Sequence, residues 1–194
     1  MTRSPAFRAT LWPHPSTPCA DLTSFDVDID ASDPDRLSLH YRLVGAIRRI
    51  RIPAPAAPVR TEGLWRHTCL ELFLGAPAGD AYVECNFAPS GAWAAYNFEG
   101  YRAGLRPHPM AAPTIAMTAS MATLDVDVSV PWPLPWPPDR AAPSGITAVI
   151  ESIDGVISYW ALAHPVDHPD FHHRGGLVLR LGRDGVRLPS ETSA

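Results

Sequence analysis

Apolar and polar residues alternate along much of the chain, in short runs separated by Pro, Gly and Asp. In 24–30 (SFDVDID), Phe25, Val27 and Ile29 alternate with aspartates, and the same period recurs in 36–44 (RLSLHYRLV) and 123–130 (TLDVDVSV). A period of two puts the apolar side chains on one face of a strand. Further candidate strands are 7–11, 47–52, 69–75, 81–87, 92–98, 114–120, 146–153, 156–162 and 177–181. The pattern predicts an all-β protein, a single-domain antiparallel β-sandwich of about ten to twelve strands over residues 1–194.

Proline is abundant, with 22 residues, and this excludes long helices because proline breaks the helical hydrogen-bond ladder. Two proline-rich stretches, 53–63 and 131–145, are predicted to be long loops of the one domain. In the second, residues 131–138 carry Trp132 and Trp136. These tryptophans either form a rigid strip that docks a partner protein or pack over an open end of the sandwich.

The formal net charge of −4 argues against a nucleic-acid partner, since phosphate binding needs a basic surface. No apolar run is long enough to span a membrane, so no membrane partner is expected. The first residues also lack the apolar stretch of a signal peptide. We therefore expect a cytoplasmic protein.

Residues 63–102 are predicted to form two consecutive hairpins and contain the most informative chemistry. In 69–75 the leucines form one face, so Glu71 and Phe73 point to the other. In 81–87, Val83, Cys85 and Phe87 form the apolar face, opposite Glu84 and Asn86. Two registers keep these faces matched: one pairs Glu71 with Glu84, and the other pairs Glu71 with Asn86.

In either register two carboxylates and an amide share the face of the sheet that points away from the core. Like charges this close are destabilising, so something must compensate them. Solvent together with an arginine, such as Arg66 or Arg102, is one explanation. The other is a polar ligand, and a sugar suits acids and amides beside aromatic rings because its hydroxyls need donors and acceptors while its ring faces are apolar.

Motifs in this region and near the C-terminus resemble the DOMON-like family of bacterial proteins. This family is related to family 9 carbohydrate-binding modules and to the haem-binding DOMON domains of extracellular cytochromes. The resemblance spans roughly residues 40–181. The matching positions are Trp65, Glu71, Phe73, Tyr82, Glu84, Asn86, Pro89, Gly91, Trp93, Trp160, His164, Pro165, Asp170, Phe171, His172, His173 and Gly176.

The resemblance implies a β-sandwich that binds a small molecule, most readily a carbohydrate, without catalysing a reaction. In carbohydrate-binding relatives two aromatic side chains hold the sugar while arginine, acids and amides bind its hydroxyls. The expected ligand-binding residues are therefore Trp65, Arg66, Glu71, Glu84, Asn86 and Trp93. In haem-binding relatives a Met and a His are the axial ligands, which makes haem the alternative cofactor.

Four histidines lie within residues 164–173 (HPVDHPDFHH), but their spacing is not that of a zinc site, and no metal is expected. Haem ligation would pair His164 or His172 with Met110, Met117 or Met121. The remaining interpretation is a loop anchor: Asp170 starts a turn, Phe171 fills the core and His172 satisfies buried carbonyls. This interpretation leaves His164 and His173 as the ligand contacts of the stretch.

An enzymatic function has little support in the sequence, because the common nucleophile, phosphate-binding and zinc-protease motifs are absent from it. One enzymatic alternative is a glycosidase-like site. It would use Glu71 and Glu84, if direct cross-strand pairing placed them at the separation of a retaining carboxylate pair.

Overall fold

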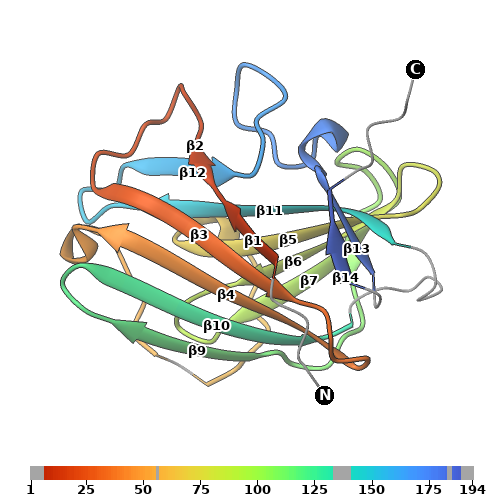
Figure 1. Cartoon of the computed structure of the whole chain (residues 1–194), viewed down its shortest axis with the longest axis horizontal. Coiled ribbons are helices and arrows are strands. Elements are labelled where there is room, and N and C mark those ends of the chain that lie inside the picture. The colour runs from red at the N-terminus through yellow and green to blue at the C-terminus, as the bar shows by residue number, and fades with distance from the viewer. Residues whose placement is uncertain (1–6, 56, 133–140, 183–184, 189–194) are drawn as a thin grey trace.

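The computed structural model of the chain describes residues 7–55, 57–132, 141–182 and 185–188. These residues form two antiparallel β-sheets that pack face to face, as Figure 1 shows. The only helices among them are three short 3-10 turns: η1 (Ile47–Arg49), η2 (Leu64–Arg66) and η3 (Arg174–Gly176). The predicted all-β sandwich is therefore confirmed, with fourteen strands in place of ten to twelve.

The smaller sheet has the strand order β1–β3–β4–β10–β9 and keeps one face in solvent. Its apolar side chains point inward, while its outer face carries charged pairs such as Arg8 with Asp28 at 2.7 Å. This division follows the alternation in the sequence. The strands are β1 (Phe7–Thr10), β3 (Leu22–Asp30), β4 (Arg36–Gly45), β9 (Thr114–Ala119) and β10 (Thr123–Pro131).

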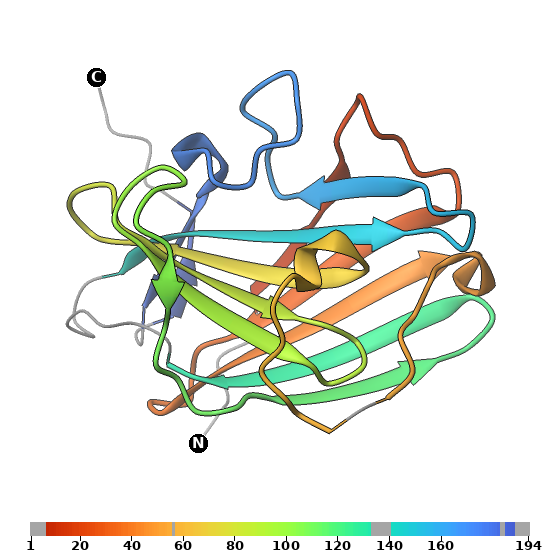
Figure 2. The same cartoon turned by 180° about the vertical axis from the view of Figure 1, so that it is seen from behind.

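The larger sheet has the order β14–β13–β11–β5–β6–β7–β8, and β12 joins it along β11. Figure 2 views the molecule from this side. The strands are β2 (Trp12–Pro13), β5 (Cys69–Gly75), β6 (Tyr82–Phe87), β7 (Trp93–Phe98), β8 (Arg106–Pro107), β11 (Ala142–Glu151), β12 (Ile157–Ala161), β13 (Leu179–Gly182) and β14 (Gly185–Arg187).

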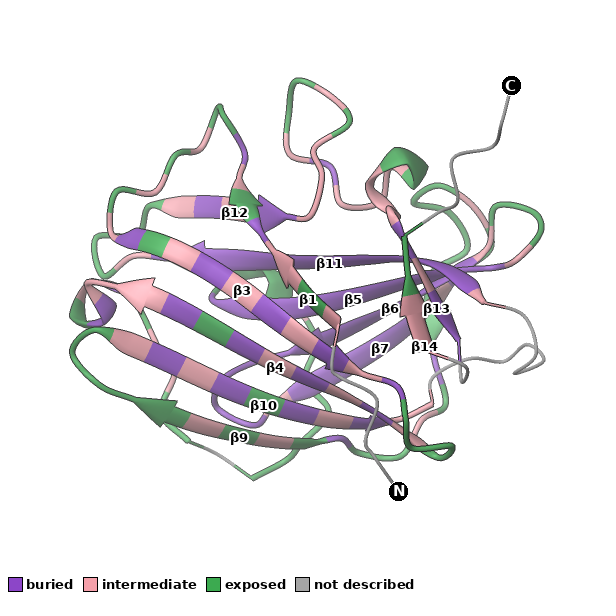
Figure 3. Cartoon of the chain, in the orientation of Figure 1, coloured by how far each residue is buried: buried purple, intermediate pink, exposed green. Residues whose placement is uncertain are grey.

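The core lies between the two sheets. Leu70, Leu72 and Leu74 of β5 point into it together with Val83 and Cys85 of β6, as the sequence predicts. The larger sheet, however, is buried on both faces. Figure 3 shows β5, β6 and β11 buried along their whole length, whereas burial alternates along β3, β4 and β10. Polar side chains on the second face of the larger sheet are therefore also buried.

β12 and β13 lie end to end along the same edge of β11. β12 pairs with residues 147–151 of β11, and β13 pairs with residues 142–144. Residues 162–178, which include the histidine-rich stretch, leave the sheet between these two strands. This segment is an excursion from what would otherwise be one continuous edge strand.

Several predicted boundaries were wrong. Residues 47–52 are not a strand: they begin with η1, because Ile47 and Ile50 are both buried and their spacing of three suits a helical turn. β11 begins at Ala142, inside the predicted loop 131–145. The short strands β2, β8 and β14 were not predicted, since two or three residues show no alternation.

The predicted partner-binding strip, 131–138, lies mostly outside the described residues, and so does Trp136. Trp132 is described: it packs against the core, and its indole N–H donates to the carbonyl oxygen of Asp33 at 3.2 Å. Among the described residues, no helix has the length and apolar character required to cross a membrane.

Candidate ligand-binding pocket

The outer face of the larger sheet forms the floor of a pocket. Antiparallel pairing aligns its side chains in rows, and in one row Glu71 lies between Thr147 and Asn86. In the next row Glu84 lies between Phe73 and Tyr96. The observed register is thus the one that pairs Glu71 with Asn86. The direct pairing of the two glutamates, on which the glycosidase alternative depends, does not occur.

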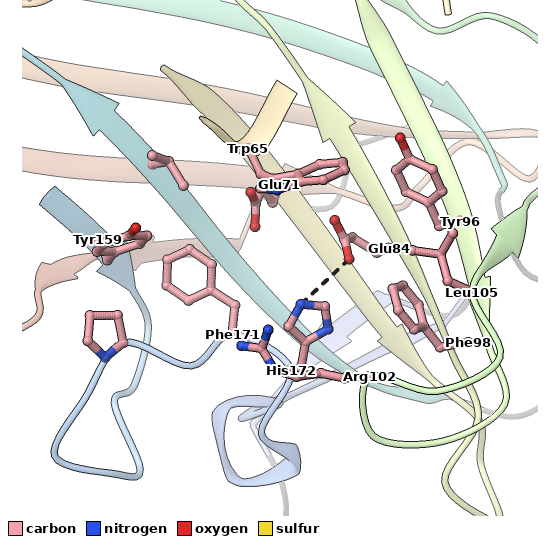
Figure 4. Close-up of a pocket in the computed structure, with 12 residues that line it drawn as sticks. Trp65, Glu71, Glu84, Tyr96, Phe98, Arg102, Leu105, Tyr159, Phe171 and His172 are labelled. Atoms are coloured by element: carbon pink, nitrogen blue, oxygen red, sulfur yellow. Dashed lines mark ion pairs between the residues drawn. The ribbon is translucent and has the colours of Figure 1, made fainter. Parts of the chain in front are cut away.

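The pocket has a volume of about 500 Å³ and brings together segments that are far apart in the sequence (Figure 4). Its walls come from η2, from the connection between β7 and β8, and from residues 162–178. The lining residues are Trp65, Glu71, Glu84, Tyr96, Phe98, Arg102, Leu105, Val149, Tyr159, Pro169, Phe171 and His172. Aromatic side chains therefore surround two carboxyl groups.

Glu71 is 2% exposed, and one of its oxygens is hydrogen-bonded: the hydroxyl of Thr147 donates to Oε2 at 3.0 Å. Burial raises the pKa of the Glu71 carboxyl well above its usual range, and the charge of Glu84 raises it further. Glu71 is therefore an acid held in conditions that oppose its ionisation.

Glu84 is 5% exposed, and the Asn86 side-chain amide donates to its Oε1 at 2.7 Å. Burial raises the pKa of Glu84, while this hydrogen bond and the positive charge of Arg102 act in the opposite direction. Asn86 is itself completely buried and accepts from the Cys69 thiol at 3.5 Å. Asn86 thus lies behind Glu84 and orients it, and does not line the pocket.

His172 closes the pocket above Glu84, with its Nε2 4.0 Å from Glu84 Oε2. Its Nδ1 lies 2.7 Å from the Tyr82 hydroxyl, which also accepts from the Arg102 backbone N–H at 3.3 Å. Burial and the charge of Arg102 lower the pKa of His172 to about 4, so the ring is neutral at neutral pH.

Asp170 holds the two wall segments together. Its carboxylate accepts from the Tyr101 hydroxyl at 2.8 Å, from Arg102 Nη2 at 2.9 Å and from the His172 backbone N–H at 3.2 Å. Burial raises the pKa of Asp170, but the hydrogen bonds from Tyr101 and Arg102 outweigh this and leave it below its usual range. These contacts also hold Arg102 at a φ of 52°, a backbone conformation that non-glycine residues rarely adopt.

The structure brings some of the predicted ligand-binding residues together and separates others. Trp65, Glu71 and Glu84 line the pocket, and Trp65 meets Tyr96 edge to face at 5.9 Å between ring centroids. Trp93 was expected on the ligand face but lies on the core face of β7 with 5% exposure, under the guanidinium of Arg60. Its position follows from the period of two, which puts Tyr96 and Trp93 on opposite faces.

Arg66, His164 and His173 do not line the pocket. Arg66 is exposed beside the Trp65 ring. His164 Nε2 is 2.9 Å from the carbonyl oxygen of Trp12. His173 caps η3, where its Nδ1 accepts from the Gly175 N–H at 3.0 Å. His164 and His173, expected to be the ligand contacts of the loop, therefore lie outside the lining of this pocket.

In the histidine-rich loop, Asp170 lies as predicted, whereas Phe171 and His172 do not. Asp170 does start a turn, as expected, since it accepts from the His172 N–H. His172, however, faces the pocket and does not bond buried carbonyls, and Phe171 packs against the second, outer cluster around Phe73 and not in the main core. The alternation in 92–98 already places Tyr96 and Phe98 on the face of Glu84, but nothing in the sequence shows that 162–178 folds over that face.

No cluster of three or more His, Cys, Asp or Glu residues occurs among the described residues in a geometry suited to a metal ion. The methionines considered for haem are distant from the pocket lining: Met110 and Met117 pack against the main core, and Met121 is 73% exposed. The structure thus does not bring any of these methionines beside His172.

The sequence matches no protein-family model and no curated protein. The structure is similar to the crystal structure of a candidate carbohydrate-binding protein from Bacteroides uniformis, with a TM-score of 0.61 and 13% sequence identity. The similarity covers 88% of this chain and 84% of that chain. The chain therefore has the β-sandwich fold of that protein over most of its length.

Proposed function

We propose that this protein binds a carbohydrate in the pocket above Glu71 and Glu84, and that it acts as a binding module without catalysis. One observation carries the proposal: two buried carboxyl groups, each supported by a neighbouring side chain, lie on the floor of a pocket with aromatic walls. The similarity to a candidate carbohydrate-binding protein supports the same ligand class.

The chemistry of the lining fits a sugar. Trp65 and Tyr159 present ring surfaces that can cover the apolar C–H face of a pyranose. The free oxygens of Glu71 and Glu84 can accept from hydroxyl groups, and Nε2 of His172, which faces Glu84, can form a further hydrogen bond with one. A volume of about 500 Å³ accommodates a small ligand of one or two rings.

The resemblance to the DOMON-like family and to family 9 carbohydrate-binding modules is part of this proposal. In this chain the sugar-holding aromatic residues would be Trp65 with Tyr96 or Tyr159, because Trp93 lies in the core. The acids keep the roles that the resemblance implies, with Asn86 acting through Glu84.

Titration with a panel of mono- and disaccharides, followed by tryptophan fluorescence, tests the proposal. Trp65 is 38% exposed at the pocket, so a bound sugar is expected to change its emission. The Trp65→Ala variant is expected to bind about tenfold more weakly, which corresponds to about 1.4 kcal/mol.

The matched control is Trp12→Ala, since Trp12 is 63% exposed on β2 and does not line the pocket. This control is expected to bind as tightly as the unmodified protein. A folded protein that responds to none of the sugars would overturn the proposal.

A further inference from the structure

We infer that the pocket selects a sugar that carries a free, protonated amino group over the neutral sugar of the same size. This inference rests on the proposed function, since it names the class of carbohydrate that the same pocket takes. The geometry points to an ammonium group because the pocket holds two acids and no cation that is free to neutralise them.

Each acid has one oxygen without a hydrogen bond. Thr147 occupies Oε2 of Glu71 and Asn86 occupies Oε1 of Glu84. Within the described residues, no donor lies within hydrogen-bonding distance of the other oxygen of either acid, and His172 Nε2 stays 4.0 Å from Glu84 Oε2. Two buried carboxyl groups, 2% and 5% exposed, therefore each present one open acceptor to the cavity.

Among the described residues that line the pocket, the only formal positive charge is already paired. Arg102 donates to Asp170 at 2.9 Å, and the side chain of Asp170 is only 3% exposed. His172 is neutral at neutral pH, with a pKa of about 4. Ionised Glu71 and Glu84 thus leave the cavity with uncompensated negative charge, which a buried site tolerates poorly without a cationic partner.

The remaining lining fits an ammonium group attached to a ring. The faces of Trp65, Tyr96 and Tyr159 attract a cation through their quadrupoles and cover the apolar face of a sugar. An ammonium group has three N–H donors, so it can bond both open oxygens, and a sugar hydroxyl has only one. An N-acetylated sugar has lost the positive charge and carries a bulkier group. It therefore neither compensates the charge of the acids nor offers three N–H donors.

Amine binding should release protons, since an ammonium group favours the ionised form of acids whose pKa is raised by burial. The other titratable groups that interact electrostatically with the two acids or contact them do not change charge near neutral pH. The pKa values of three tyrosine hydroxyls are raised by burial, as are those of two buried thiols: Tyr41, Tyr82, Tyr96, Cys69 and Cys85, while the pKa of Arg102 is also raised and that of His172 is lowered. The released proton therefore comes from Glu71 or Glu84.

The test is calorimetric titration of the whole chain with matched trios: glucosamine, glucose and N-acetylglucosamine, and the corresponding galactose and mannose series. In each trio that shows binding, the amino sugar is expected to bind about ten- to one-hundredfold more tightly than the neutral sugar. This difference is typical of a hydrogen bond to a charged group. Repeating the titration in two buffers of different ionisation enthalpy should show proton release for the amine alone.

The variants Glu71→Gln and Glu84→Gln are expected to abolish most of the amine preference while changing affinity for the neutral sugar less. Glu99→Gln is the control, because Glu99 is 63% exposed, pairs with Arg106 and does not line the pocket. The comparison of ligands on the unmodified protein does not depend on these variants folding.

The outcomes separate the two proposals. Equal or tighter binding of the neutral sugars would overturn the amine inference and leave carbohydrate binding in place. Binding of a simple primary amine such as ethanolamine without binding of any sugar would overturn both, as would the absence of all binding.

Discussion

At the scale of single residues, Glu71 is the position where the proposed ligand binding costs the most stability of the folded protein. Its carboxyl is buried, receives one hydrogen bond from Thr147 and lies near a second acid. A residue selected only for stability at this position would be neutral. We therefore attribute the acid to what it does in the pocket.

The Glu71→Gln variant is expected to be more stable than the unmodified protein at pH 7.5, by about 1–2 kcal/mol, a typical single-residue effect. The folded-state pKa of Glu71 is raised, so the stability that its protonated form contributes is present below pH 4.5 and is lost as the pH rises. The difference between variant and parent should thus shrink toward pH 4.5. Urea denaturation at several pH values measures it.

The control for this prediction is Glu62→Gln, the same chemical change at an exposed position. Its stability should follow that of the parent across the pH range. A Glu71→Gln protein that is less stable at pH 7.5, or whose difference from the parent is independent of pH, would contradict the prediction.

At the scale of elements, the pocket depends on a loop in which one carboxylate connects two segments of the pocket wall. Asp170 joins residues 162–178 to the β7–β8 connection through two hydrogen bonds, from Tyr101 and Arg102, and it accepts a third from the His172 backbone N–H within the loop. The wall of the pocket and the conformation of Arg102 therefore depend on one buried anion.

Replacing Asp170 with Ala is expected to destabilise the protein by about 2–4 kcal/mol, since it leaves Arg102 and two further donors without their buried partner. It should also weaken ligand binding, because His172 and Phe171 lose their anchor. Chemical denaturation and ligand titration measure the two effects.

Asp167→Ala is the matched control, because Asp167 lies in the same loop with its side chain 98% exposed. This variant should leave both stability and binding unchanged. A loss of stability in both variants would show that the loop as a whole, and not the Asp170 contacts, matters.

Elements with a long alternating pattern could be predicted from the sequence, and short or irregular ones could not. The faces of β5 and β6 follow from a period of two, and so does the position of Glu71 beside Asn86 in one of the two registers. The register itself was not decided by the sequence, because both options keep the core face intact. The segment 47–52 was mistaken for a strand because Ile50 and Ile52 alternate with arginines, although Ile47 and Ile50 have the spacing of a helical turn.

At the scale of the whole molecule, the two sheets differ in how they are covered. The smaller sheet has a solvent face, while β5, β6 and β11 are covered by the core on one side and by loops on the other (Figure 3). Solvent can reach the backbone amides of these strands only when both the core side and the covering loops separate from them.

Hydrogen exchange is therefore expected to be slowest in β5, β6 and β11, by about tenfold relative to β4 and β10 under native conditions. All of these strands are paired on both edges, so the comparison isolates the effect of the second covering. Exchange that is slower in β4 and β10 than in β5 and β6 would contradict the expectation. Exchange resolved by residue with NMR provides the measurement.

The site was predictable only in part, because it is assembled by tertiary contacts. Glu71, Glu84 and Trp65 lie within one stretch of sequence and were identified from it. Arg102 and His172 reach the same cavity through Asp170, and no local pattern links these three residues. Of the four histidines in 164–173, only His172 lines the pocket, and the sequence does not show which of them the fold turns toward it.

The interruption between β12 and β13 has a consequence for how such a protein can diverge. Both ends of residues 162–178 are fixed on the edge of β11, so the excursion begins and ends at two anchors that the framework supplies. A segment of another length or composition can start and finish at the same anchors while the pairing of β12 and β13 with β11 is kept. A change in the length or composition of this excursion would therefore reshape one wall of the pocket while the order of the strands beneath it stays the same.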